Sequence, residues 1–308
     1  MAINYRDIVH PEDESALRQL ENTTGVKLLA EKLVSIGAER YLHNQYMADC
    51  LRLGPKQLPE IYERLLPIVE KFGIPEPEFY LQQSPVLNAW TQGDKKPFIV
   101  ITSGLVSALT KEEFDSVVAH ECGHILCHHC LYKTVLSILQ LMLAQTSQGI
   151  SASVPGLSLL TGPVLSGAYY AANYWSRRSE YSADRASVIY TGDAQVTQKA
   201  LLRIHAGPSP ITDNVNLDTY IEQSKQIEEE QADNSWDKFL SMLLVKDRSH
   251  PFGTTRLAEI RKWANSAQYR TVLANLDKPQ YSSLTCPNCN REIDGTWKFC
   301  RYCGQKVQ

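Results

Sequence analysis

The residue types that could do chemistry appear first in the hexapeptide AHECGH, residues 119–124. His120 and His124 are four residues apart, and Glu121 directly follows the first of them, which is the HExxH spacing. On an α-helix, residues four apart lie one above the other on the same face, so both imidazoles can reach one zinc ion. Glu121 would then lie beside the open coordination position, where a general base can act on a water molecule.

A second pair of candidate groups has the same spacing. Glu180 and Asp184 are four residues apart, so both carboxylates face the same way on a helix. One carboxylate can bind zinc, while the other can hold a zinc-binding histidine through its free ring N–H. Together with Arg177, the two acids also fit a solvated helix face with intrahelical ion pairs. The spacing alone leaves both interpretations open.

A third group lies at the end of the chain, where four cysteines form two CxxC pairs: Cys286, Cys289, Cys300 and Cys303. Four thiolates at this spacing predict a closed tetrahedral zinc site. A segment of roughly 25 residues cannot build its own hydrophobic core, so a structural zinc ion would fold it. The pattern indicates a zinc ribbon but does not identify its partner, which leaves open binding to another protein or simple capping of a domain.

The amino-acid composition limits the classes of protein to which the sequence can belong. The 308 residues are 43% hydrophobic and 21% charged, which is typical of a globular protein. A formal net charge of −3 and the absence of a polybasic run argue against a nucleic-acid or anionic-lipid partner. The first residues, MAINYRDIVH, contain no apolar signal region. The clustered cysteines suit metal binding in a reducing compartment, so we expect a cytoplasmic location.

The elements that must position these groups are mostly helical. Apolar spacing predicts helices up to about residue 75, and β-branched and aromatic residues predict strands over 78–82 and 98–102, with a loop at 91–96 between them. Thr110 and Glu113 fit a capping box that starts a helix through both motif histidines. We therefore expect a mostly α, α+β fold with a small sheet edge strand over the HExxH helix, plus the ribbon.

Residues 134–176 contain no Asp, Glu, Lys or Arg. The first half of this segment is strongly apolar, and the second half is interrupted by proline and glycine. Because a membrane-spanning helix needs about 20 predominantly apolar residues, two spans would just fit. Several glutamines and serines favour a buried or membrane-surface helical hairpin, but membrane association through this segment stays open.

With these pieces located, the chain resembles the HtpX and CAAX-prenyl-protease family of zinc metallopeptidases, a gluzincin group. The resemblance extends over about 170 positions and rests on five segments in family order: 84–89 with Asn88 and Ala89; 98–109; 118–124 with His129 beyond it; Arg177, Glu180, Ala183 and Asp184 as RxxExxAD; and His250 with Arg256 as HPxxxxR. The metzincin pattern HExxHxxGxxH does not fit, because its glycine and third histidine would fall at Cys127 and Cys130. We interpret these cysteines and Cys122 as small buried apolar groups.

The resemblance implies roles for individual residues. Glu180 becomes the third zinc ligand, while Asp184, Arg177 and Arg256 support the ligands. His250 would stabilise the oxyanion, and Glu121 would be the general base. A strand beside a protease site can also align an extended peptide by adding it to the sheet edge. We expect this of the strand containing Phe98, Ile99, Val100 and Ile101, together with Asn88 and Ala89; the alternative is an ordinary buried strand.

These roles predict a zinc-dependent endopeptidase that acts on protein or peptide substrates, with protein quality control as the implied setting. The expected divisions are an N-terminal helical region packed on the catalytic domain (1–75), a metallopeptidase core (76–264), a linker (265–284) and the ribbon (285–308). The alternative is a non-enzymatic zinc protein that acts as a scaffold or adaptor through its ribbon. Two zinc ions, one catalytic and one structural, are expected for the enzyme.

Overall fold

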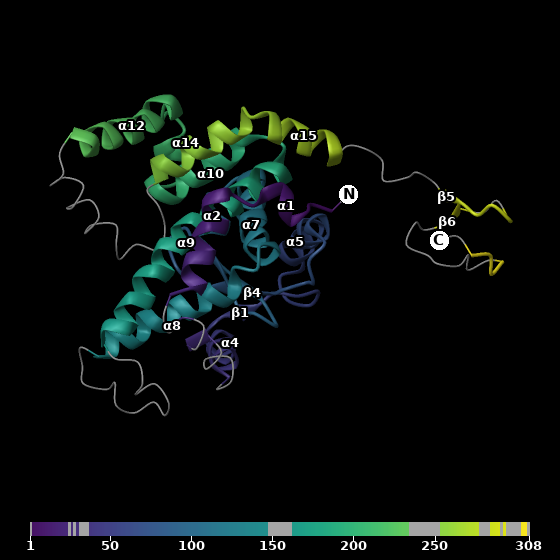
Figure 1. The fold of residues 1–308 in the computed structure, drawn as a ribbon, viewed down its shortest axis with the longest axis horizontal. Helices are drawn as coiled ribbons and strands as arrows, with labels where there is room; N and C mark the ends of the chain where they lie inside the picture. The colour runs from purple at the N-terminus through teal and green to yellow at the C-terminus, as the bar shows by residue number, and fades with distance from the viewer. Residues whose placement is uncertain are drawn as a thin grey trace.

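The structure is a computed structural model that describes residues 2–23, 26, 29–30, 37–146, 162–233, 253–276, 284–289, 292–293 and 303–306. Helices surround one mixed four-stranded sheet, and a two-stranded hairpin follows near the C-terminus (Figure 1). This arrangement confirms the expected α+β fold with a small C-terminal module.

The sheet is built from β1 (Leu51–Arg52), β2 (Glu78–Gln82), β3 (Ala89–Gln92) and β4 (Phe98–Thr102), in the spatial order β1-β2-β4-β3. The two predicted strands are confirmed as β2 and β4, with the predicted bounds. The short strands β1 and β3 were not predicted. Thr91 and Gln92, which we expected in a loop, belong to β3.

The expectation that β4 aligns an extended peptide is wrong. β4 pairs in parallel with β2 on one side and antiparallel with β3 on the other. Because both of its edges are occupied, Phe98, Ile99, Val100 and Ile101 have no free backbone edge to offer a peptide. Among the described residues β3 has no second strand partner, so the sheet edge lies at β3, where Asn88 and Ala89 are found.

The two faces of the sheet are covered by different helices, as the alternation of strand side chains requires. Phe79, Ile99 and Ile101 pack in one cluster with apolar residues of α5 (Pro59–Phe72) and α7 (Lys111–Leu126). Tyr80, Phe98 and Val100 form a smaller cluster on the other face, against Tyr46 of α4 (Ala38–Asp49). The sheet therefore fixes the position of α7 relative to its edge.

Helix α7 carries both motif histidines and begins at the predicted capping box. The Thr110 side chain accepts from the backbone N–H of Glu113, and the Glu113 carboxylate accepts from the backbone N–H of Thr110. α7 packs along α9 (Gly162–Thr191), where an added Cβ on Gly123 would lie 2.5 Å from the Cβ of Ala186. The glycine at position 123 therefore allows the two helices to approach closely.

The N-terminal helices α1 (Tyr5–Ile8) and α2 (Pro11–Glu21) also contact α9. In Figure 1, α2 lies along α9, and α9 runs beside α8 (Cys130–Thr146). Apolar residues of the three helices form one buried cluster, which includes Ala16, Leu20, Val135, Leu136, Leu139, Ala168, Ala172 and Trp175. In the described part of the chain, no helix is both long and apolar enough to cross a membrane. Residues 147–161, between α8 and α9, lie outside the described residues.

The remaining helices lie at the end of the molecule opposite α4 (Figure 1). They are α10 (Ala194–Ala206), α11 (Ser209–Thr212), α12 (Leu217–Asp233), α14 (Gly253–Ala264) and α15 (Ala267–Leu276), while α6 (Ser103–Ala108) follows β4 directly. Both α10 and α14 pack on α9. The C-terminal hairpin pairs β5 (Leu284–Thr285) with β6 (Glu292–Ile293).

We predict that Gly123→Ala lowers the stability of the chain, because the new methyl group would overlap Ala186 and push α7 away from α9. Overpacking of this kind costs about 1–3 kcal/mol. Gly167→Ala in α9 is the matched control, since a Cβ there meets no atom within 4 Å. Thermal unfolding should show a lower midpoint for Gly123→Ala and an unchanged or higher one for Gly167→Ala. Equal midpoints for both variants would contradict the close approach.

Candidate functional site

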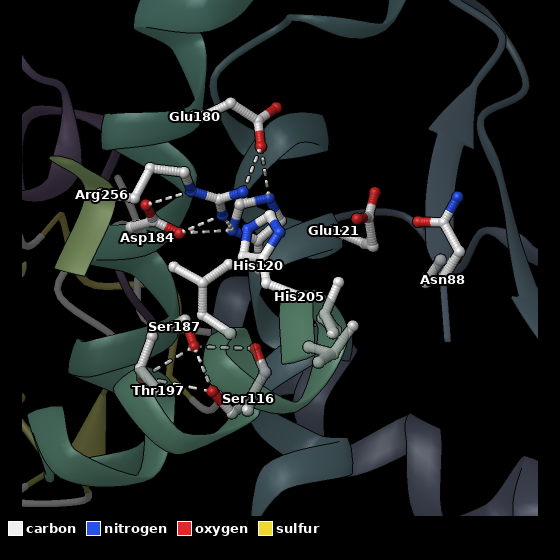
Figure 2. Close-up of a pocket in the computed structure, with 15 residues that line it drawn as sticks. Asn88, Ser116, His120, Glu121, Glu180, Asp184, Ser187, Thr197, His205 and Arg256 are labelled. Carbon is white, nitrogen blue, oxygen red and sulfur yellow. Dashed lines mark hydrogen bonds and ion pairs between the residues drawn. The ribbon is translucent and has the colours of Figure 1, made fainter. Parts of the chain in front are cut away.

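The two predicted pairs of groups face each other across the contact between α7 and α9. Figure 2 shows His120 beside Glu180 and Asp184. The rings of His120 and His124 lie on one face of α7, with centroids 4.8 Å apart. The Nε2 atom of His120 is 3.5 Å from one carboxylate oxygen of Glu180, and the Nε2 atom of His124 is 3.3 Å from the other. The Glu180 carboxylate therefore spans both imidazoles.

The donor atoms at this site fit a catalytic zinc ion. One ligand atom each from His120, Glu121 and His124 lie within 4.8 Å of one another. Glu180 adds a carboxylate that faces both histidine Nε2 atoms and is 1% exposed. Two imidazoles and one carboxylate, with a fourth position for water, are the usual ligands of catalytic zinc in proteins.

A buried ion-pair network holds the first histidine and the Glu180 carboxylate. The Nδ1 atom of His120 lies 3.0 Å from Asp184, which receives hydrogen bonds of 2.9 and 2.6 Å from the Arg256 guanidinium. The same guanidinium is 3.1 Å from Glu180. A carboxylate at Nδ1 places the ring proton there and leaves Nε2 free to bind metal.

Charge compensation in this network shifts the ordinary pKa values. Burial opposes protonation of His120, but the carboxylates of Asp184 and Glu180 outweigh it and raise the pKa of His120 to about 9. Burial also opposes ionisation of Asp184, but Arg256 outweighs it and holds the pKa of that carboxyl below its ordinary value. For His124, burial and the Lys133 ammonium lower the pKa of the ring well below its usual range. The lowered pKa favours the neutral form of His124, which is the form that binds metal, whereas a metal ion bound at His120 would displace the extra proton of that ring.

Glu121 is held by the sheet edge. Its carboxylate is buried and accepts a 2.6 Å hydrogen bond from the Thr91 hydroxyl of β3. The sequence contains no local signal for this contact, because it depends on how β3 is placed against α7. Thr91 is thus a residue of the site that sequence reasoning missed.

Two cavities meet at this group of residues. Asn88, Ala89, His120 and Glu121 line both cavities. The first has a volume of about 130 Å³, with Val117, Ala200, Leu201 and Ile204 among its walls. The second has a volume of about 330 Å³ and is lined by more polar groups, including Gln92, Lys133, Ser137 and Gln140. Space for a ligand therefore exists in two cavities that share His120 and Glu121, while His124 lines the second cavity.

Not every predicted residue enters this site. Phe98 to Ile101 are buried in the central strand, one strand away from the edge. Arg177 lies on α9 less than one turn before Glu180 and is partly exposed. His250 lies outside the described residues. The cysteines at 122, 127 and 130 are buried as expected, and burial raises the pKa of each thiol.

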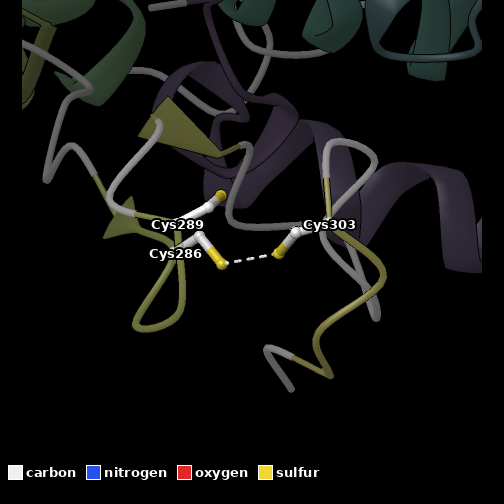
Figure 3. Close-up of side chains that lie close together, drawn as sticks. All are labelled: Cys286, Cys289 and Cys303. Atoms are coloured by element: carbon white, nitrogen blue, oxygen red, sulfur yellow. Dashed lines mark hydrogen bonds between the residues drawn. The ribbon is translucent and has the colours of Figure 1, made fainter.

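The C-terminal module gathers a second set of donors (Figure 3). The thiol groups of Cys286, Cys289 and Cys303 lie within 4.8 Å of one another, and the Sγ atoms of Cys286 and Cys303 are 3.5 Å apart. A hydrogen bond from the Gln305 backbone, with a further one from Asn288, lowers the pKa of Cys303 to about 6. This shift favours the thiolate that zinc requires. Cys300 lies outside the described residues.

Comparison with known proteins identifies two domains in the chain. Residues 55–264 match the model of peptidase family M48, and residues 285–307 match a zinc-ribbon domain. The plastoglobule-localized metallopeptidase 48 of Arabidopsis thaliana chloroplasts is 27% identical over 275 residues, which cover 88% of this chain and 76% of the relative.

Protease HtpX homologues of Trichormus variabilis and Campylobacter concisus are each 25% identical. The matched segments cover 59% and 66% of this chain, and 72% and 73% of the two relatives. No solved structure matches the chain significantly.

Two separate donor sets predict about two zinc ions per purified chain. Glu180→Ala should remove one zinc ion while leaving the ribbon loaded, because the sites share no residue. Cys289→Ser should remove the other and leave the site between α7 and α9 loaded. Elemental analysis of the purified variants measures both. A single zinc ion that persists in Glu180→Ala and disappears in Cys289→Ser would contradict the site between the helices.

Proposed function

The chain belongs to peptidase family M48, and we propose that it is a zinc-dependent endopeptidase that cleaves an extended protein segment lying along β3. The observation that carries this proposal is that His120 and Glu121 line two cavities together with Asn88 and Ala89 at the sheet edge. A substrate that continues in both directions from the cleaved bond fits this arrangement better than one that ends there.

The edge strand can orient such a substrate through its backbone. The N–H of Thr102 donates to the carbonyl of Asn88 at 3.0 Å, so these residues form a hydrogen-bonded pair. Pairs alternate along an antiparallel ladder, and the N–H and C=O groups of Ala89 and Thr91 therefore point away from β4. An extended peptide that adds to this edge would form its hydrogen bonds with Ala89 and Thr91.

Each group of the site has a proposed task. His120, His124 and Glu180 would hold zinc, which when bound polarises the scissile carbonyl and makes water more acidic. Glu121 would accept the proton of the attacking water and pass it to the leaving amine. Asp184 and Arg256 keep His120 oriented. His250 is proposed as the oxyanion-stabilising group from its place in the HPxxxxR motif alone.

The smaller cavity provides a basis for side-chain preference. Beside the charged groups of the site, its lining includes the aliphatic side chains of Val117, Leu201 and Ile204. Three hydroxyl groups, those of Ser116, Ser187 and Thr197, lie together in the same lining (Figure 2). These hydroxyls hydrogen-bond one another, so they offer little to a charged side chain. We infer a preference for a small or medium apolar side chain next to the cleaved bond.

A role in protein quality control is proposed on the resemblance to HtpX proteases. A quality-control peptidase should cleave an unfolded protein such as casein faster than a folded protein of similar size. Mass spectrometry of the products would also reveal whether cleavage is internal and which side chains flank the cleaved bond.

Replacing Glu121 with glutamine tests the proposed reaction. Glu121→Gln keeps the size of the side chain but cannot accept a proton, so peptide hydrolysis should fall by about 10²–10⁴-fold while zinc content stays at the wild-type level. Cleavage of a fluorogenic peptide with blocked ends measures the rate, and elemental analysis provides the control. Undiminished cleavage by this variant would contradict the assignment of Glu121 as the general base.

Replacing Thr91 tests how the general base is held. Thr91→Val keeps the shape of the side chain but removes the hydrogen bond to Glu121, which should lower kcat by about 10–100-fold, because a hydrogen bond to a charged group contributes about 1.5–3 kcal/mol. Thr91→Ser restores the hydroxyl and should recover most of the rate. If both variants have the same rate, the hydroxyl does not position Glu121.

A further inference from the structure

Asp13 is a buried carboxylate of the N-terminal helix α2, far from the metal-binding motifs in sequence. It is 2% exposed, and a buried charge is costly unless it is paired and hydrogen-bonded. The Ser182 hydroxyl donates to one of its oxygens at 2.5 Å, and the Trp175 indole N–H donates to the other at 3.1 Å. Both donors belong to α9, the helix that carries Glu180 and Asp184.

The third partner of Asp13 connects it to the metal site. The Nε2 atom of His129 lies 3.0 Å from Asp13, and the Nδ1 atom of the same ring lies 2.8 Å from the Nδ1 atom of His124. His129 is 1% exposed, so water does not replace either contact. Asp13, His129 and His124 therefore form a continuous buried chain of hydrogen bonds.

The direction of this chain follows from metal binding. The Nε2 atom of His124 faces Glu180, so it is the atom available to a metal. A neutral imidazole that binds metal through Nε2 carries its proton on Nδ1, and His124 must then donate to His129. His129 must accept at Nδ1 and carry its own proton on Nε2. That proton is donated to Asp13, which accepts it as a carboxylate.

Without Asp13, no group in this chain of hydrogen bonds would favour the proton positions that leave the Nε2 atom of His124 free. His129 could then carry its proton on Nδ1 and donate it to His124. The His124 proton would in turn lie on Nε2, where it blocks metal binding. An ionised carboxylate at the far end removes this second arrangement, because it accepts a hydrogen bond and cannot donate one.

We propose that Asp13 is a positioning residue of the metal centre, which acts through His129 to hold His124 in its metal-binding form. Each histidine ligand would then have its own carboxylate: Asp184 directly at His120, and Asp13 through His129 at His124. Asp13 lies outside residues 55–264, which match the peptidase family, so the N-terminal region supplies part of the site in this chain. The inference rests on the proposed role of His124 as a zinc ligand.

Asp13→Asn tests the proposal in the full chain. We expect zinc to bind 10- to 100-fold more weakly, as measured by competition with a chromophoric chelator, because the loss of such an outer partner has an effect of this size. Glu14→Gln is the matched control, since it removes one charge from an exposed position on the same helix and should leave zinc affinity unchanged. The ribbon is identical in all variants, so differences report on the site between α7 and α9.

A second variant separates positioning from general packing. His129→Phe breaks the chain at its middle and should weaken zinc binding to the same extent. The double variant Asp13→Asn, His129→Phe should lose no more affinity than either single variant, because both changes break one chain of contacts. Additive losses would indicate independent packing defects and would overturn the proposal. If Asp13→Asn does not fold, the zinc affinity of His129→Phe tests the proposal alone. Wild-type zinc affinity in His129→Phe would also overturn the proposal.

His124→Ala distinguishes this proposal from the proposed function. If His124→Ala loses the zinc ion between the helices but Asp13→Asn retains wild-type affinity, only the role of Asp13 fails. If His124→Ala retains both zinc ions, the assignment of His124 as a ligand fails as well.

Discussion

Two carboxylates, Glu180 and Asp184, are buried one turn apart on α9, and the rest of the site depends on how their charge is balanced. Burying an ionised carboxylate costs several kcal/mol unless opposite charge and hydrogen bonds replace the lost water. Arg256 of α14 provides that balance for both acids, and Lys133 of α8 adds a 2.8 Å contact to Glu180. The two histidines of α7 complete the surroundings of the same carboxylates. Residues from four helices therefore meet at one centre.

The same constraint explains the close packing of α7 and α9. Imidazole and carboxylate groups reach each other across two helices only when the backbones approach closely, and Gly123 permits this approach. The sheet then places β3 beside α7, so that Thr91 contacts Glu121. Proposed metal ligands, general base and substrate edge are thus fixed by one packing arrangement of two helices and one strand.

Local patterns were sufficient to predict much of this arrangement. The capping box at Thr110 placed the start of α7, and β-branched runs placed β2 and β4 with the correct bounds. Strand β3 was missed because it has only four residues and leads into a polar loop. The choice of β4 as the peptide-binding strand was wrong because strand order depends on tertiary pairing, which no local pattern encodes. Asp13 and Thr91 escaped prediction for the same reason, since each reaches the site from a distant segment.

We propose that Glu180, rather than Glu121, completes a zinc site with His120 and His124. Diffraction data collected at the zinc absorption edge from crystals of the zinc-loaded chain would locate the metal and its ligands. We expect an anomalous peak about 2.0–2.2 Å from both histidine Nε2 atoms and from a carboxylate oxygen of Glu180, with Glu121 outside the coordination sphere. A peak bound by Glu121 in place of Glu180, or no peak between α7 and α9, would contradict it.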